Sequence, residues 1–186
     1  MRHGATEWSE NGRHTGRTDL PLIAAGRAQA EQARRRVLAE LGDEQFVLWS
    51  SPLRRASETA AILFGDRPCS FDARLSEFDY GDLEGLTNAQ IVERIPGWTV
   101  WDGCPGGESL DQVVQRVDSF LAELRLAMID THLVVAHSHL LRAFGARALA
   151  QPAAFGRQLT LDTASVSVID DYRGAPRIVR WNSSDC

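Results

Sequence analysis

The sequence is poor in cysteine, has no excess of basic residues and contains no long apolar run. Its three cysteines, Cys69, Cys104 and Cys186, are odd in number and lack metal-ligand spacing, so they predict reduced thiols in a cytoplasmic protein. Acidic residues outnumber basic ones by 25 to 20, which argues against nucleic acid or an anionic membrane as a partner, because both require clustered positive charge. Without an apolar stretch near Met1 or elsewhere, neither a signal peptide nor a membrane span is predicted.

The length and composition are those of one globular domain. The chain has 186 residues, and we expect a single domain over 1–186. Apolar residues make up 44% and charged residues 24% of the chain, without a low-complexity tract, which is typical of a protein that buries one core. No internal repeat or linker divides the chain.

Predicted helices alternate with short apolar strands. Helical spacing and capping residues predict helices over 27–41, 52–64, 87–95, 110–124 and 140–149. Apolar runs predict strands over 46–49, 70–72, 133–136, 166–169 and 178–181. This alternation predicts a three-layer α/β sandwich with a mostly parallel central sheet, which binds its ligands at the carboxyl ends of the strands.

Local signals mark two helix starts and one irregular segment. Ser51 followed by Pro52 is a typical N-cap and first-turn pair, and Ser109 with Gln112 forms a capping box. The segment around 78–108 is rich in glycine, proline and aromatic residues, so we expect a loop-rich lid there.

Arginine and histidine residues gather at three predicted strand ends. These are Arg2-His3-Gly4, Ser51-Pro52-Leu53-Arg54-Arg55 and His137-Ser138-His139. Because the carboxyl ends of parallel strands meet at one edge of a sheet, we expect these side chains to lie together. Arginine forks suit phosphate oxygens, and the N–H groups of Ser138 and His139 open a helix that can bind the same anion. The sequence therefore predicts a locally positive phosphate site in an acidic chain.

A proton donor for a departing oxygen is expected on the loop after residue 75. That loop has four carboxyl groups, and their spacing does not choose among Glu77, Asp79, Asp82 and Glu84. The choice is open on spacing alone.

The remaining histidines receive a structural interpretation. His14, His132 and His139 are expected to be structural or to face solvent, with substrate contact by His14 or His139 as the alternative. A metal site made by His3, His137 and His139 is disfavoured, because the neighbouring arginines would repel a dication.

Six blocks of residues follow one another in an order that is typical of a known family. They are Arg2-His3-Gly4-Ala5-Thr6-Glu7-Trp8, His14-Thr15-Gly16-Arg17-Thr18-Asp19-Leu20-Pro21-Leu22, Ser51-Pro52-Leu53-Arg54-Arg55-Ala56, Glu77 with Tyr80-Gly81 and Glu84-Gly85, Gly107-Glu108-Ser109, and Ala136-His137. With these blocks the chain resembles the histidine phosphatase superfamily, the phosphoglycerate-mutase-like proteins, over nearly its whole length. The Arg-His-Gly block alone is a weak signal, whereas six blocks in order are specific.

The resemblance implies a role for each matched residue. His3 matches the family's nucleophile, Glu77 matches its proton donor, and the phosphate pocket is matched by Arg2, Arg55 and His137. The implied enzyme is a metal-independent phosphatase without a cofactor, which hydrolyses a small phosphorylated metabolite, a sugar phosphate or similar, through a phosphohistidine. Because Glu77 must first be protonated, we expect activity to fall toward high pH.

Four further residues are expected near the substrate. Thr15 and Gly16 match a loop that contacts substrate in several members of the family. Ser9 and Ser138 stand where many members have Asn and Gly, and they keep a hydroxyl donor and a backbone N–H, respectively.

The chain departs from the family at its start. Members usually have an apolar strand immediately before the Arg-His-Gly block, whereas only Met1 precedes it here, so this strand is expected to be truncated.

Two other functions are alternatives to the phosphatase, and a homodimer is an alternative for the assembly. A phosphoglycerate-type mutase would return the phosphoryl group to the substrate, but the stretch between Glu77 and Glu108 is short for such an enzyme. A catalytically inactive phosphate-binding module is the other alternative. A homodimer is an open alternative to the monomer.

Overall fold

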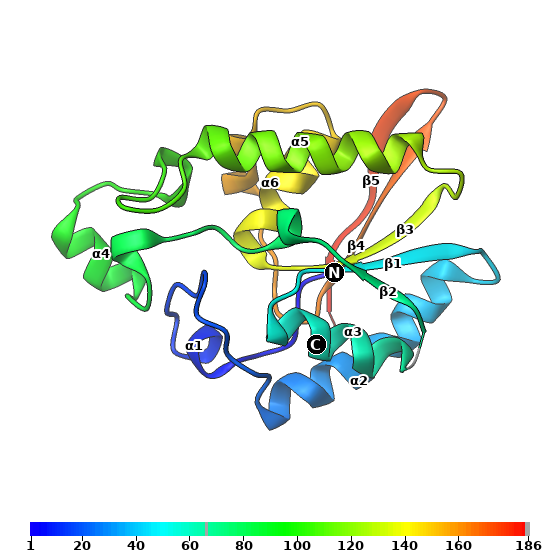
Figure 1. Ribbon diagram of the computed structural model, residues 1–186, viewed down its shortest axis with the longest axis horizontal. Coiled ribbons are helices and arrows are strands. Elements are labelled where there is room, and N and C mark those ends of the chain that lie inside the picture. The colour runs from blue at the N-terminus through cyan, green and yellow to red at the C-terminus, as the bar shows by residue number, and fades with distance from the viewer. Residues whose placement is uncertain (66, 185–186) are drawn as a thin grey trace.

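The centre of the protein is a parallel sheet, shown in Figure 1 for the computed structural model, which describes residues 1–65 and 67–184. Strand β1 (Phe46–Ser50) lies between β2 (Cys69–Phe71) and β3 (Thr131–Val135), so the strand order is β2-β1-β3. These strands agree with the predicted ones to within two residues at each end.

Helices cover both faces of this sheet. Helices α2 (Ala24–Leu41) and α3 (Arg54–Phe64) lie on one face, and α5 (Leu110–Leu126) and α6 (Ser138–Ala148) lie on the other (Figure 1). This arrangement confirms the predicted three-layer α/β fold with a mostly parallel sheet.

Alternation along β3 explains the two layers of core. Leu133 and Val135 pack into the cluster that contains α2 and α3, whereas Val134 packs into the cluster that contains α5 and α6. Because successive side chains of a strand point to opposite faces, one continuous apolar run serves both cores. The sheet thereby becomes a rigid base whose carboxyl edge carries the residues that follow each strand.

The first residues of the chain lie beside β3. Arg2 pairs in parallel with Ala136, and the His3 N–H donates to the Ala136 carbonyl at 2.9 Å. On its other side this short segment meets the residues before β4, because the Ala164 N–H donates to the His3 carbonyl at 3.0 Å. The backbone of His3 is therefore fixed between two segments, although the pairing is only a single bridge.

The two closing strands form a hairpin. Strands β4 (Val166–Tyr172) and β5 (Ala175–Ser183) pair antiparallel. Strand β4 begins where predicted and ends three residues later, whereas β5 is longer than predicted at both ends. Short helices complete the fold: α1 (Glu7–Glu10), α4 (Asn88–Arg94) and the 3-10 helices Ala73–Leu75, Gly81–Leu83, Val100–Asp102 and Ala153–Gln158.

The irregular segment around 78–108 is also a wall of the main core. Several of its side chains are almost fully buried in the cluster that includes α5 and α6, namely Phe78, Tyr80, Leu83, Ile91, Val100 and Trp101. Burial of a large apolar side chain contributes about 1.5–3 kcal/mol, so the segment is held in place by its packing. Burial also raises the pKa of the Cys104 thiol to about 12, so this thiol stays protonated at neutral pH.

Two local predictions about helix starts had different outcomes. The capping box of α5 is confirmed, because the Gln112 N–H donates to Ser109 Oγ at 3.2 Å and the Ser109 N–H donates to Gln112 Oε1 at 2.8 Å. The N-cap assigned to Ser51 is wrong, since α3 begins at Arg54 and its N-cap is Leu53. The Ser51 hydroxyl instead contacts the ring of His137. The prediction for Cys186 lies outside the described residues.

Candidate active site

A cavity of about 160 Å³ lies beside the start of α6. In the part of the chain that the structure describes, its lining residues are Arg2, His3, Thr6, Ser9, Gly12, Arg13, His14, Thr15, Glu77, Tyr80, Ser138 and His139. Six of the nine predicted site residues are among them. The other three, Arg55, His137 and Gly16, are buried and do not line the cavity.

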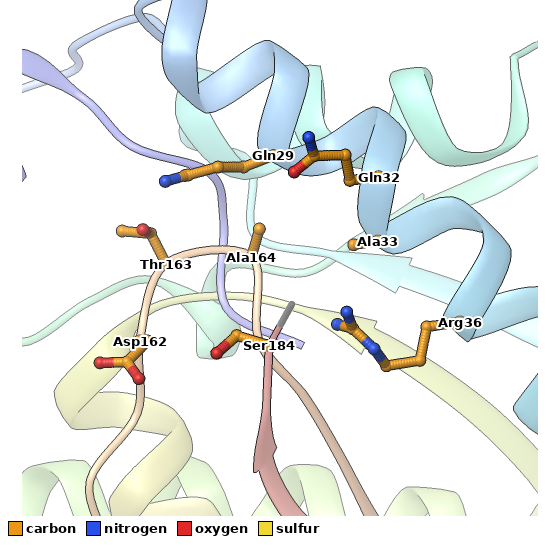
Figure 2. A pocket seen from close by; sticks show the side chains of 8 residues that line it. All are labelled: Gln29, Gln32, Ala33, Arg36, Asp162, Thr163, Ala164 and Ser184. Carbon is orange, nitrogen blue, oxygen red and sulfur yellow. The ribbon is translucent and has the colours of Figure 1, made fainter. Parts of the chain in front are cut away.

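A second hollow, of about 200 Å³, lies between α2 and residues 162–164 (Figure 2). Gln29 and Gln32 from α2 face Asp162 and Thr163 across it. Its described lining residues include no histidine and none of the predicted site residues. The cavity around His3 is therefore the candidate active site.

His3 is held in the form that a nucleophile requires. Its side chain is buried, and Nδ1 lies 2.7 Å from the Gly4 carbonyl oxygen. A carbonyl oxygen only accepts, so Nδ1 carries the proton and Nε2 keeps a free lone pair. Burial, reinforced by the positive charges of Arg2 and Arg55, holds the pKa of His3 well below its ordinary value. The ring is therefore neutral at neutral pH.

The carbonyl group of Gly4, which accepts the His3 hydrogen bond, is held in place by a close backbone contact. A Cβ at this position would lie 2.3 Å from the Gly26 carbonyl oxygen, so helix α2 packs directly on the backbone of residue 4. Only glycine fits this contact, which holds the carbonyl acceptor of His3 in place.

Arg2 has an unused donor beside the cavity. Its Nη1 donates to the Leu161 carbonyl at 2.6 Å, whereas its Nε is buried without a hydrogen-bond partner among the described residues. Burial lowers the pKa of Arg2, yet an arginine stays protonated at neutral pH because its ordinary pKa is above about 12. A buried donor without an acceptor costs about 1–3 kcal/mol, and a bound oxyanion would remove this cost.

Arg55 and His137 lie together in the buried layer next to His3. The Arg55 Nε donates to His137 Nδ1 at 3.1 Å, and the rings of His137 and His3 have centroids 5.2 Å apart. Since His137 Nδ1 accepts, its Nε2 carries the proton and donates to Ser51 Oγ at 2.8 Å. Burial, followed by the charge of Arg55, holds the pKa of His137 well below its ordinary value.

The other donors of Arg55 hold the loop that covers this layer. Its Nη2 donates to the carbonyl oxygens of Thr15 at 3.0 Å and Gly16 at 2.9 Å. Its Nη1 donates to the Thr18 carbonyl at 3.0 Å. The structure thus places Arg55 and His137 next to His3, as expected. Their side chains are hydrogen-bonded to other protein groups and are not exposed in the cavity.

Glu77 caps helix α6 from outside the helix. Its Oε1 accepts the N–H groups of Phe78 at 3.1 Å and Leu140 at 2.8 Å, and its Oε2 accepts the N–H of His139 at 3.0 Å. The first N–H groups of a helix have no partner within the helix, so this carboxylate satisfies two of them. The prediction that the His139 N–H binds phosphate is wrong in this arrangement, since Glu77 occupies that donor.

The predicted substrate residues have different environments. Ser9 lines the cavity, but its hydroxyl donates to the Thr6 carbonyl at 2.9 Å and accepts the Thr6 N–H at 2.8 Å. Thr15 and Ser138 also line the cavity. Gly16 does not, and this placement does not support direct substrate contact: a Cβ there would lie 2.4 Å from the Phe78 carbonyl oxygen, so Gly16 serves close packing.

Sequence reasoning missed an aromatic wall of the cavity. The rings of His14 and His139 stack with centroids 5.8 Å apart, and the Tyr80 hydroxyl lies 2.6 Å from His139 Nδ1. Both histidines line the cavity, which supports the alternative of substrate contact over a solvent-facing role. Burial holds the pKa of His139 well below its ordinary value. No spacing signal links these residues, because they come from three separate segments.

The geometry agrees with comparisons to known proteins. Residues 1–184 match the profile of the Histidine phosphatase superfamily (branch 1). The chain belongs to this superfamily. It is 43% identical over 181 residues to an acid phosphatase from Mycobacterium tuberculosis, a match that covers 96% of this chain and 88% of that protein.

Two further similarities place the protein within the histidine phosphatase superfamily. A probable phosphoglycerate mutase from Salmonella paratyphi C is 36% identical over 180 residues, which cover 91% of this chain and 82% of the relative. A solved structure of an open reading frame product from Mycobacterium tuberculosis has a TM-score of 0.91 and 37% identity, and the match covers 98% of this chain and 95% of that one. These comparisons support a phosphatase of the histidine phosphatase superfamily.

The described residues of this histidine phosphatase include neither a membrane-spanning helix nor a metal-binding cluster. Over residues 1–65 and 67–184, no helix is long and apolar enough to cross a membrane. Within the same ranges, no group of three or more histidine, cysteine, aspartate or glutamate side chains is arranged to hold a metal ion.

Proposed function

We propose that the protein is a metal-independent phosphomonoesterase that hydrolyses a small phosphorylated metabolite through a phosphohistidine on His3. The observation that carries this proposal is the state of His3, which is a buried, neutral ring with Nδ1 bound to the Gly4 carbonyl and a lone pair on Nε2. It shares one cavity with Arg2 and Glu77. A nucleophile, a cation and a carboxyl group are thus within one small site.

In the first step, Nε2 of His3 attacks phosphorus and the bond from phosphorus to the leaving oxygen breaks. The leaving oxygen takes a proton from the Glu77 carboxyl group. Negative charge on the phosphoryl oxygens is stabilised by Arg2, whose Nε has no acceptor among the described residues.

In the second step, water attacks the phosphorus of phosphohistidine while Glu77 takes a proton from it. The bond from His3 to phosphorus breaks, inorganic phosphate leaves, and both residues return to their starting forms. The same carboxyl group therefore acts first as an acid and then as a base.

Arg55 and His137 complete the phosphate pocket in this proposal. Arg55 places further positive charge behind the phosphoryl group, and the neutral ring of His137 is bound to it. A direct bond from either residue to phosphate requires a rearrangement, because Arg55 is bound to loop carbonyls and His137 to Ser51. This explains how both residues can support the site without lining the cavity.

A mutase is the second candidate, since a relative with 36% identity bears the name of a probable phosphoglycerate mutase. The test measures release of inorganic phosphate from p-nitrophenyl phosphate and from phosphoglycerates, with and without EDTA, alongside interconversion of the phosphoglycerates. We expect phosphate release that EDTA does not change and that His3→Ala abolishes. Interconversion without net release would favour the mutase, and phosphate binding without turnover would indicate an inactive module.

A further inference from the structure

Glu77 lies in a stretch of backbone that has no regular secondary structure. Residues 76–80 belong to no helix or strand. Backbone carbonyl groups in such a stretch need hydrogen-bond donors from elsewhere when they are shielded from water. The backbone around Glu77 is therefore held by groups outside the segment, and this backbone carries the carboxyl group.

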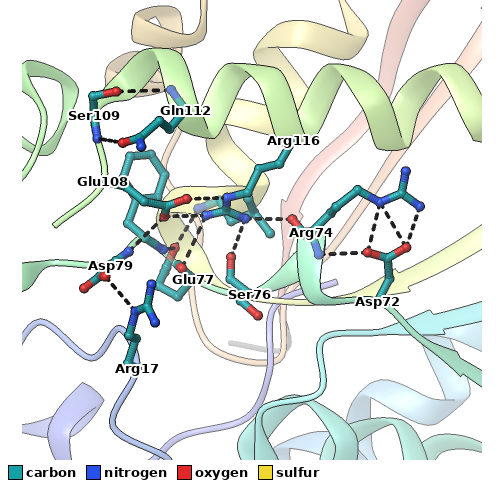
Figure 3. Close-up of polar contacts among 12 residues, drawn as sticks. Arg17, Asp72, Arg74, Ser76, Glu77, Asp79, Glu108, Ser109, Gln112 and Arg116 are labelled. Atoms are coloured by element: carbon teal, nitrogen blue, oxygen red, sulfur yellow. Dashed lines mark hydrogen bonds and ion pairs between the residues drawn. The ribbon is translucent and has the colours of Figure 1, made fainter.

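Arg116 of helix α5 supplies these donors. Its Nη1 donates to the carbonyl oxygens of Arg74 and Ser76, each at 2.7 Å, and its Nη2 donates to the Glu77 carbonyl at 3.3 Å (Figure 3). One guanidinium group thus binds the backbone on the N-terminal side of Glu77 and at Glu77 itself. Its planar fork holds three carbonyl groups in a fixed geometry and keeps two further donors free, whereas a lysine has only three donors in total.

Glu108 completes the arrangement on the other side. Its carboxylate accepts Nε and Nη2 of Arg116 at 2.8 and 3.0 Å, and it accepts the Asp79 N–H at 3.0 Å (Figure 3). The Glu108 N–H in turn donates to the Asp79 carbonyl at 2.9 Å. The side chains of this ion pair are only 15% and 20% exposed, so it is a two-bond contact largely shielded from water.

We propose that Arg116 and Glu108 position Glu77 for proton transfer. The inference rests on the proposed function, in which Glu77 is the proton donor. Neither Arg116 nor Glu108 is among the described residues that line the cavity, so both act through Glu77. A proton donor must lie within about 2.6–3.2 Å of the leaving oxygen, and a displacement of about 1 Å can lower the rate about a hundredfold.

The leaving group separates this role from a merely structural one. Phenyl phosphate releases a basic phenolate that needs a proton, whereas p-nitrophenyl phosphate releases a more stable anion that needs it little. The two substrates are close in size, and kcat/KM for each reports the transfer of the phosphoryl group to His3. Misplacement of Glu77 therefore affects phenyl phosphate far more than p-nitrophenyl phosphate.

The experiment measures kcat/KM of Arg116→Gln and Glu108→Gln on both substrates. We expect losses of about 30- to 100-fold on phenyl phosphate and of less than about fivefold on p-nitrophenyl phosphate. Glu123→Gln is the matched control, because it removes the negative charge that α5 presents to the Arg74 side chain without changing a group that binds the backbone around Glu77. In this control variant, kcat/KM is expected to change little, and by the same factor on both substrates.

Each outcome decides between the inference and the function on which it rests. Equal losses on both substrates in the Arg116 and Glu108 variants overturn the inference. Glu77→Gln is measured beside them. If only Glu77→Gln loses kcat/KM selectively on phenyl phosphate, the positioning role is overturned and the acid role of Glu77 stands. If Glu77→Gln loses kcat/KM equally on both substrates, the acid role is overturned as well. Should Arg116→Gln fail to fold, Glu108→Gln keeps the side-chain shape and decides the question by itself.

Discussion

Replacement of Arg55 by methionine tests whether the buried layer next to His3 is built as described. The guanidinium group donates to His137 Nδ1 and to the carbonyl oxygens of Thr15, Gly16 and Thr18. Methionine fills a similar volume but donates no hydrogen bond, so Arg55→Met leaves four acceptors without this donor. At about 1–3 kcal/mol each, the loss is about 4–12 kcal/mol before any relaxation.

Two effects reduce this loss. Burial lowers the pKa of Arg55, which shows that the folded protein bears a cost for keeping the cation away from water, and methionine removes that cost. Water can also reach some of the freed carbonyl groups. We therefore expect a net loss of about 3–5 kcal/mol in the free energy of unfolding. In a domain of this length, that corresponds to a fall in Tm of about 6–20 °C.

The assay is thermal and denaturant unfolding of Arg55→Met beside Arg54→Met. Arg54 precedes it in the same helix, and its side chain is 57% exposed and contacts only Glu58 among the described ion pairs. Its removal is expected to cost less than about 1 kcal/mol. A loss for Arg55→Met within about 1 kcal/mol of the control would refute the account of this buried layer.

Three further predictions concern pH, packing and phosphate binding. Burial holds the pKa of His3 and His137 well below the ordinary value, so the unfolded chain binds more protons at mildly acidic pH. The stability that depends on these two rings is therefore fully present above about pH 6.5. Below that pH, the free energy of unfolding falls by up to about 1.4 kcal/mol per pH unit for each ring. A Tm that stays constant between about pH 7.5 and 5 would contradict this. Gly16→Ala places a Cβ 2.4 Å from the Phe78 carbonyl oxygen and is expected to cost about 1–3 kcal/mol in denaturant unfolding, so an unchanged midpoint would count against the close packing. Arg2→Gln is expected to weaken binding of inorganic phosphate about ten- to a hundredfold in calorimetric titration, and equal affinity would show that its unpartnered Nε does not meet the anion.

Local patterns predicted most of the fold. Ser109 and Gln112 lie three residues apart, so their capping box is visible in the sequence and its hydrogen bonds form within one turn of helix. The apolar run through Val134 identified a buried strand in the same way. The N-cap prediction for Ser51 was wrong because its hydroxyl group is hydrogen-bonded to His137, 86 residues away in the sequence. A local rule contains no information about such a partner.

The site was predicted as a set of residues, but their contacts were not. Strand ends and the family resemblance brought together His3, Arg2 and Glu77, which share the cavity. Three of the four acceptors of Arg55 lie in a loop 37 to 40 residues away, and nothing in the spacing shows that its donors bind that loop. The same holds for the aromatic wall of the cavity, whose rings meet only after the sheet has brought distant segments together.

The central claim is that Nε2 of His3 forms a covalent bond to phosphorus. The most direct test is rapid mixing of the enzyme with p-nitrophenyl phosphate, followed by a quench in alkali that preserves phosphohistidine. Peptide mass spectrometry then locates the phosphoryl group. The account predicts a transient phosphoryl group on the peptide that contains His3, absent from His3→Ala. A phosphoryl group on another residue, or turnover in His3→Ala, would contradict it.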